Sequence, residues 1–153
     1  MKYTEIQGDL FKNLVRDKDN KLTYTEDDVP VYCHCIANDG RWGAGIAPIF
    51  IDRVFDFRKE TLYMLNHHKW DGTGCCGLTS KDISGKPSYV TITESLKSLR
   101  KSMEESYLLD KDFVVLKMPK IGCGLDKLDW SIVSTLIKGV FSDTNISIEI
   151  YYL

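Results

Sequence analysis

The sequence contains no long apolar run, no internal repeat and no low-complexity segment. Its first residues, MKYTEIQGDLF, include Glu5 and Asp9 and lack an apolar stretch, so they predict neither a signal peptide nor a membrane-spanning helix. The 20 Lys and Arg residues and 22 Asp and Glu residues give a net charge of -2, which excludes a global positive field that would attract a polynucleotide. We therefore expect a cytoplasmic protein with no membrane partner, in which local groups hold any small anionic ligand.

Metal-ligating patterns are also missing. The cysteines form no CxxC pair and do not have the spacing of a secreted disulfide framework, so we interpret all five as reduced thiols. In the segment YCHC, alternation along a predicted strand puts Cys33 and Cys35 on one face and His34 on the other. We therefore expect no bound metal and no cofactor.

The composition is that of one ordinary folded domain. Of the 153 residues, 43% are hydrophobic, 11% aromatic and 27% charged. This length is enough for one buried core and short for two, so we expect a single domain over residues 1–153. We expect that domain to be a monomer.

Two kinds of hydrophobic pattern alternate along the chain. Short stretches with a period of about two predict strands over residues 3–7, 31–37, 75–79, 113–118 and 146–152. Stretches with a period near 3.6 predict helices over residues 57–68, 89–103 and 130–140. This alternation indicates the α/β class. Residues 113–116 are expected to be buried on both faces, whereas 16–28, RDKDNKLTYTEDD, is interpreted as a solvated surface loop.

A glycine-rich segment, GRWGAGIAPIF, follows the predicted strand YCHCIA and contains Gly40, Gly43 and Gly45. Glycines let consecutive backbone N–H groups turn toward one ligand, and the N-terminus of a following helix adds partial positive charge. The segment therefore predicts a phosphate-binding loop. A tight turn that needs positive φ is the structural alternative, because the segment matches neither the P-loop lysine motif nor the GxGxxG fingerprint.

A second glycine loop, MPKIGCGLDKLDW, follows the buried strand FVVLKM and precedes the helix that begins near Trp130. Loops that leave the carboxyl ends of parallel strands line one crevice, so we expect the two glycine loops to face each other and to hold a pyrophosphate. Asp126 ends this loop and is a candidate to bind a ribose hydroxyl or to orient a water molecule. Asp129 is better placed than Asp126 to cap the helix.

A different chemistry fits one part of the first loop. His34, Cys35 and Arg41 satisfy the minimal H-C-x5-R pattern of cysteine-dependent phosphatases, in which a thiolate attacks phosphorus and the arginine binds its oxygens. Against this interpretation, Asp39 puts a carboxylate where a dianion should bind, and no Ser or Thr follows Arg41. The glycines also come later than that motif requires.

Four segments taken together resemble the macrodomain family: GDLF, HCIANDGRWGAGIA, LTSKDISGKPSY and MPKIGCGLDKLDW, with IEIYYL at the end. They cover nearly the whole chain. Their order and spacing are similar to the branch of terminal ADP-ribose protein glycohydrolase and to the yeast-type ADP-ribose 1''-phosphate phosphatases. The resemblance implies a three-layer α/β/α sandwich with a mixed central sheet and a cleft that binds ADP-ribose.

The resemblance also implies which residues contact the ligand. Asp9 and Leu10 match the adenine-side residues of the family, where a carboxylate can accept a hydrogen bond from the exocyclic amine. His34 matches a histidine that is present in both branches, although a strand histidine is more often structural than a base. The pyrophosphate and distal ribose are expected between two sets of loop residues, Gly43, Ala44, Gly45 and Ile46, and Gly122, Cys123, Gly124, Leu125 and Asp126.

The sequence departs from the glycohydrolase branch at the position of the catalytic lysine. In that branch a lysine directly after the threonine of the loop matching LTSKD attacks the ribose, and the aspartate that matches Asp126 assists. Here Ser80 follows Thr79, and Lys81 is one place further along. On a regular strand that step would turn Lys81 to the other face, whereas in a loop its side chain could still reach the ligand. The phosphatase branch carries threonine and serine at this place and needs no lysine.

These patterns leave three functions open. The first choice is hydrolysis of ADP-ribose 1''-phosphate to ADP-ribose and phosphate, with His34 or Asp126 activating a water molecule. The second is an ADP-ribosyl hydrolase that releases the sugar from acidic side chains or nucleic-acid bases, using Asp126 and Lys81. The third is a reader that binds ADP-ribose, alone or on modified macromolecules, without cleaving it. Ser80 and Lys81 are therefore candidate catalytic residues alongside His34 and Asp126, and Thr79 is a candidate ligand contact.

Overall fold

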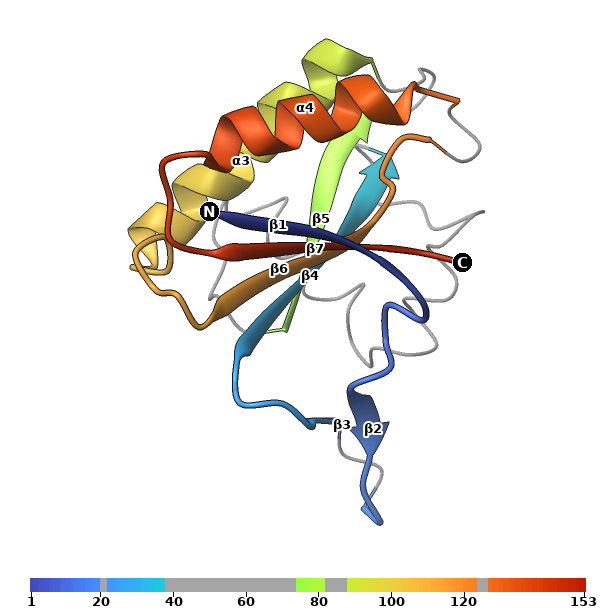
Figure 1. Ribbon diagram of the computed structural model, residues 1–153, viewed down its shortest axis with the longest axis vertical. Helices are drawn as coiled ribbons and strands as arrows, with labels where there is room; N and C mark the ends of the chain where they lie inside the picture. The colour runs from blue at the N-terminus through green and yellow to red at the C-terminus, as the bar shows by residue number, and fades with distance from the viewer. Residues whose placement is uncertain (20–21, 38–73, 82–87, 124–126) are drawn as a thin grey trace.

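The computed structural model describes residues 1–19, 22–37, 74–81, 88–123 and 127–153 (Figure 1). The described strands are β1 (Lys2–Gln7), β2 (Leu14–Arg16), β3 (Leu22–Tyr24), β4 (Val29–Ala37), β5 (Gly74–Lys81), β6 (Val114–Pro119) and β7 (Ser147–Tyr152). The described helices are α3 (Tyr89–Glu105) and α4 (Trp130–Phe141). The five strands and two of the three helices predicted from periodicity are confirmed. The predicted helix over 57–68 lies outside the described residues.

The central sheet has five strands in the order β1-β7-β6-β4-β5, and every described pair in it is parallel. Val31 lies opposite Leu116, which in turn lies opposite Ile148. All three side chains are fully buried, so one row of aliphatic residues crosses the middle of the sheet. Burial of this row fixes the register, because a slip of one residue would turn each strand over.

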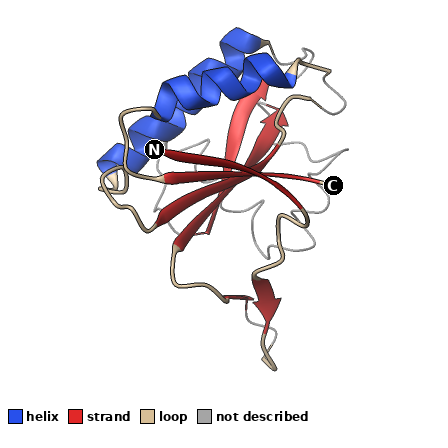
Figure 2. Ribbon diagram, viewed as in Figure 1, coloured by secondary structure: helices blue, strands red, loops and turns tan. Residues whose placement is uncertain are grey.

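Both described helices cover the same side of the sheet (Figure 2). Each helix turns one apolar stripe toward the sheet, at the spacing of a helix that is buried on one face. The buried hydrophobic residues of α3 are Ile92, Leu96, Leu99 and Met103, and those of α4 are Val133, Ile137, Val140 and Phe141. Together with the aliphatic row of the sheet they form the main core.

The α/β class is confirmed, and one detail, the mixed sheet, needs correction for the part of the chain that the structure describes. A mixed sheet was expected, but the sheet in the described part of the chain contains parallel pairs only. From β6 to β7 the chain crosses over through α4, which is the connection that a parallel pair requires. The described helices make one layer, and a second helical layer would have to come from residues outside the described ranges.

The segment 16–28 is not simply a loop. Residues Leu14–Arg16 and Leu22–Tyr24 pair as an antiparallel hairpin, which extends away from the central sheet at the lower end of Figure 1. These strands have three residues each, too few for a periodic signal. The expectation for residues 113–116 was wrong for Phe113, which is 49% exposed because it precedes the first residue of β6.

The cysteine prediction is confirmed at one position and wrong at another. Cys123 is a free thiol, whereas Cys33 takes part in a disulfide. Cys33 lies in β4 opposite Cys76 of β5. β4 and β5 are distant in the sequence, so spacing along the chain could not reveal which residues lie beside Cys33.

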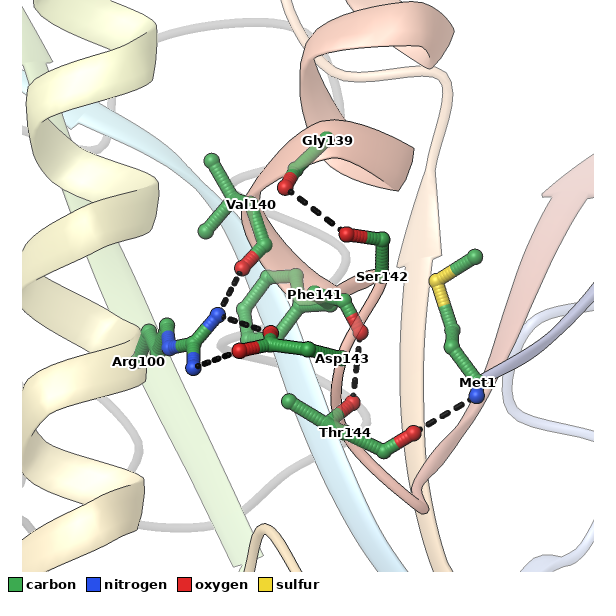
Figure 3. A network of polar contacts seen from close by, with 8 residues as sticks. All are labelled: Met1, Arg100, Gly139, Val140, Phe141, Ser142, Asp143 and Thr144. Carbon is green, nitrogen blue, oxygen red and sulfur yellow. Dashed lines mark hydrogen bonds and ion pairs between the residues drawn. The ribbon is translucent and has the colours of Figure 1, made fainter.

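A polar network around Arg100 lies at the amino end of the central sheet (Figure 3). Nη1 of Arg100 donates to the carbonyl oxygen of Val140 and to Oδ1 of Asp143, both at 2.5 Å, and Nη2 donates to Oδ2 of Asp143 at 3.0 Å. The N-terminal ammonium of Met1 donates to the carbonyl oxygen of Thr144 at 2.6 Å. The network joins α3, the end of α4 and the start of the chain.

Candidate functional site

The carboxyl ends of all five central strands lie at one edge of the sheet, because the strands are parallel. The strands end there at Gln7, Ala37, Lys81, Pro119 and Tyr152. Most of the residues singled out in the sequence follow these ends within a few positions. In open parallel sheets, ligands bind in the crevice outside the carboxyl ends.

The strand order identifies one position along this edge. From β4 the chain proceeds to β5 on one side, whereas from β6 it proceeds to β7 on the other side. The boundary between β4 and β6 is therefore the topological switch point, where the two connections diverge and leave a crevice. The two glycine loops of the sequence follow these two strands. Their expected proximity is supported by the direct pairing of β4 with β6.

The described part of the second loop has a glycine in a conformation that other residues avoid. Gly122 has φ of 73°, and a Cβ built on it would lie 2.7 Å from Cδ1 of Ile92 and 3.0 Å from Cδ1 of Leu128. The carbonyl oxygen of Gly122 accepts a hydrogen bond from the N–H of Leu128 at 2.8 Å. The absent side chain therefore lets the loop pack against α3 while it turns toward α4.

Asp129 begins α4, as the sequence predicted. Its Oδ1 accepts hydrogen bonds from the backbone N–H of Ser131 at 2.9 Å and from the hydroxyl of Ser131 at 2.8 Å. These bonds to Ser131 hold the pKa of the Asp129 carboxyl below its usual range. The confirmed cap at Asp129 leaves the capping role unavailable to Asp126, which lies outside the described residues.

Cys123 follows Gly122 and is half-buried. Its Sγ donates to the carbonyl oxygen of Ile121 at 3.3 Å. Burial raises the pKa of the Cys123 thiol, and the charge of Asp129 adds to that rise while Lys120 opposes it. The thiol is therefore protonated at neutral pH, which suits a structural position in the loop and not a nucleophile.

A short turn follows β1 on the other flank of the edge. The N–H of Gly8 donates to the carbonyl oxygen of Tyr152 at 2.8 Å, which ties the start of the turn to the end of β7. Oδ1 of Asp9 accepts from the N–H of Phe11 at 2.9 Å. Asp9 is exposed and Leu10 is buried, so the carboxylate can face a ligand while Leu10 anchors the turn.

The end of β5 contains an irregularity at the position where the sequence departs from the glycohydrolase pattern. Thr79 lies opposite Ile36, but Lys81 lies opposite Ala37, so the register shifts by one residue and Ser80 is the extra residue. In a regular pairing Ser80 would lie opposite Ala37. Lys81 therefore takes the register position that Ser80 would occupy. The sequence predicted that Lys81 would turn to the other face of the sheet if it lay on a regular strand. Because the pairing is shifted at this position, that objection to Lys81 as a candidate catalytic residue no longer applies.

Of the other predicted site residues, His34 lies within β4, opposite Gly77 and three residues before the strand ends. Other predicted positions lie outside the described residues: Arg41 of the alternative phosphatase pattern, Gly43, Ala44, Gly45, Ile46, Gly124, Leu125 and Asp126. Across the described ranges, no three His, Cys, Asp or Glu side chains gather as a metal site. No described helix is both long and apolar enough to cross a membrane.

Sequence reasoning missed a group of side chains at the carboxyl edge. Nζ of Lys120 lies 4.6 Å from the ring centroid of Tyr152 and 3.9 Å from Oε1 of Glu5. Nε1 of Trp130 donates to the same Glu5 oxygen at 3.2 Å. This group joins β1, β7, α4 and the second glycine loop, and only the position of Lys120 inside MPKIGCG signalled it.

Comparison with known proteins gives a consistent result. The sequence is 34% identical over 150 residues to ADP-ribose glycohydrolase OARD1 of Homo sapiens, covering 88% of this chain and 93% of the relative. The macrodomain of Thermus aquaticus DarG superposes with a TM-score of 0.69 at 16% identity, over 99% of this chain and 98% of that chain. Thermosipho africanus DarTG in complex with ADP-ribose gives a TM-score of 0.67 at 14% identity, over 98% of this chain and 41% of that chain. No protein-family model matches the chain.

Proposed function

Because this chain belongs to the macrodomain family, we propose that it binds ADP-ribose at the carboxyl edge of its sheet and hydrolyses the bond at the distal ribose. The observation that carries the proposal is the switch point between β4 and β6, from which both glycine loops leave. Two loops of this kind on neighbouring parallel strands suit the two phosphates of a pyrophosphate. The complex of Thermosipho africanus DarTG with ADP-ribose, a structure of the same fold, supports this choice of ligand.

The reaction that we propose is release of ADP-ribose from a modified macromolecule. The relative that shares 34% identity is named an ADP-ribose glycohydrolase, which favours this alternative over the phosphatase that the sequence alone suggested. In this mechanism the neutral amine of Lys81 attacks C1'' of the distal ribose and displaces the linked carboxylate. Water then hydrolyses the adduct, which frees ADP-ribose and regenerates the amine. Asp126 would orient the ribose hydroxyls or the water molecule.

The register shift at Ser80 supports Lys81 in this role. The family's lysine directly follows the threonine that matches Thr79, and here the shift gives Lys81 the register position next after Thr79 on β5. Ser80 is thus the one additional residue between Thr79 and Lys81, and the irregularity lets Lys81 pair where a residue directly after Thr79 would pair.

A phosphatase acting on ADP-ribose 1''-phosphate is the second candidate. The observation that favours it is the pair Thr79-Ser80, which is the pattern of the phosphatase branch. In that reaction a water molecule attacks phosphorus, ADP-ribose leaves with its 1''-oxygen, and no lysine adduct forms.

Substitution of Lys81 separates the two reactions. We expect Lys81→Ala to abolish release of ADP-ribose from a peptide carrying it on a glutamate side chain, with little change in the affinity for ADP-ribose. Lys97→Ala, on the exposed face of α3, is the matched control and should leave the activity unchanged. If Lys81→Ala retains wild-type release from the peptide, the lysine mechanism is wrong. If the wild type acts only on ADP-ribose 1''-phosphate, the second candidate replaces the first.

A further inference from the structure

A lysine is buried on the sheet face that turns away from α3 and α4. Lys117 lies in β6 between Leu116 and Met118, both of which belong to the main core, so its side chain projects from the opposite face. The residue is only 2% exposed, although burial of an ammonium group is unfavourable unless charged or polar partners compensate it. A buried lysine therefore marks a place where other groups have been arranged around a positive charge.

The groups around Lys117 come from two segments, β3 and β7, that are far apart in the sequence. Its Nζ lies 3.5 Å from Oε1 of Glu149 on β7. It also lies 5.0 Å from the ring centroid of Tyr24, at the end of β3, and 5.7 Å from that of Tyr151. The hydroxyl of Tyr151 donates to the same Glu149 oxygen at 2.8 Å. The positive charge is therefore held by one carboxylate and two aromatic faces.

The stack continues to the turn after β1. Nζ of Lys12 lies 5.6 Å from the ring centroid of Tyr151. Tyr24, Lys117, Tyr151 and Lys12 thus form an alternating series of aromatic rings and ammonium groups, which we call the lysine–tyrosine stack. One end of the stack is the hairpin, and the other end is the turn that contains Asp9.

Backbone contacts link the same turn to the hairpin directly. The N–H of Leu14 donates to the carbonyl oxygen of Phe11 at 2.9 Å, and the N–H of Thr25 donates to that of Asn13 at 2.9 Å. The Phe11 ring stacks on Tyr32 with centroids 5.7 Å apart, and Tyr32 lies opposite Lys117 in the sheet. The hairpin, the turn and the sheet face that turns away from α3 and α4 are therefore connected by direct contacts.

We propose that Lys117 is a positioning residue that clamps the turn of residues 9–14 through the lysine–tyrosine stack, and so sets the affinity for the nucleoside end of the ligand. This inference rests on the proposed function for the identity of the ligand. It also gives a role to the charged segment 16–28, because Tyr24 in that segment places its ring against the Lys117 ammonium group. Without the Tyr24 ring the ammonium group would be exposed to water, and the turn of residues 9–14 would lose part of the lysine–tyrosine stack that holds it.

Replacement of the charge tests the clamp. We expect Lys117→Met to raise the Kd for ADP-ribose about fivefold or more, with a higher KM and an unchanged kcat in the hydrolysis. Amide hydrogen exchange of residues 9–14 should become faster in the same variant. Lys117→Arg, which retains the charge and can stack on both rings, should restore most of the affinity. Tyr24→Leu removes one ring from the hairpin side of Lys117 and should raise the Kd and the exchange rates in the same way. This variant tests the clamp if Lys117→Met fails to fold.

A second lysine gives the matched control. Nζ of Lys138 lies 4.3 Å from the ring centroid of Tyr3 on the α4 side of the sheet, so Lys138→Met removes the same kind of contact at a distance from the turn. It should leave the Kd and the exchange of residues 9–14 unchanged. The proposal is overturned if folded Lys117→Met or Tyr24→Leu binds ADP-ribose and exchanges these amides as the wild type does. If the wild type does not bind ADP-ribose, the proposed function fails, and the exchange rates still test the clamp.

Discussion

Gly122→Ala is the substitution for which the structure gives the clearest expectation. Gly122 lies in the second glycine loop at φ of 73°, where an alanine is strained by about 1 kcal/mol or slightly more. Its new Cβ would also lie 2.7 Å from Cδ1 of Ile92 and 3.0 Å from Cδ1 of Leu128. Ile92 is only 1% exposed and sits in the main core, so it can move aside only by disturbing other buried residues.

The two costs can be added because one belongs to the backbone and the other to packing. Overpacking of a core costs about 1–3 kcal/mol, so with the strain at φ we expect Gly122→Ala to destabilise the protein by about 2–4 kcal/mol. For a chain of this size, each kcal/mol lowers the melting temperature by about 2–4 °C. The displaced loop should also bind ADP-ribose more weakly.

Urea unfolding followed by circular dichroism measures the first effect, and calorimetry with ADP-ribose measures the second. Gly139→Ala is the matched control. Gly139 lies inside α4, and a Cβ built there meets nothing within 4 Å, so alanine should stabilise the protein by up to about 1 kcal/mol. Equal unfolding midpoints for Gly122→Ala and wild type would refute the assigned conformation of the loop.

Three further predictions concern the scaffold. Ser88→Ala removes the side-chain cap of α3 and should cost about 1 kcal/mol in urea unfolding, without changing the Kd for ADP-ribose. Leu96→Ala opens a cavity at a fully buried position and should cost about 2–5 kcal/mol by the same measurement. Asp143→Asn should remove part of the acid sensitivity, because the hydrogen bonds from Arg100 hold the pKa of the Asp143 carboxyl below its usual 3.8. A lowered pKa stabilises the fold above pH 3.8, and this contribution is lost as the pH falls through the lowered value. The difference in stability between wild type and variant should therefore be seen at pH 7 and should shrink steadily as the pH falls below 3.8.

Much of the fold follows from local pattern. The strand VVLKMP and the stripe from Ile92 to Met103 are each long enough to define an element, and the cap at Asp129 is a local signal. The hairpin at 14–24 was missed because its strands have three residues each. Phe113 was placed in the core because an aromatic residue beside three buried aliphatic residues extends the pattern, whereas it lies just before the strand.

The candidate site could be predicted in outline only. The order of strand, glycine loop and helix occurs twice, and this predicted two loops at one edge. The pairing of β4 with β6 had to come from the structure, since its partners, such as Val29 and Val114, are 85 residues apart in the sequence. The register shift at Ser80 and the burial of Lys117 also depend on distant partners. In the sequence, Lys117 is one charged residue within an apolar strand, and nothing near it identifies Tyr24 or Glu149 as its neighbours.

The central claim is hydrolysis at the distal ribose of a ligand bound at the carboxyl edge. It is tested most directly by chromatographic measurement of ADP-ribose released from a peptide that carries ADP-ribose on a glutamate side chain. We predict many turnovers per molecule of wild-type protein, with equal amounts of free ADP-ribose and unmodified peptide. Release no faster than in the blank without protein, together with tight binding of ADP-ribose and no turnover of ADP-ribose 1''-phosphate, would contradict the claim and identify the chain as a reader.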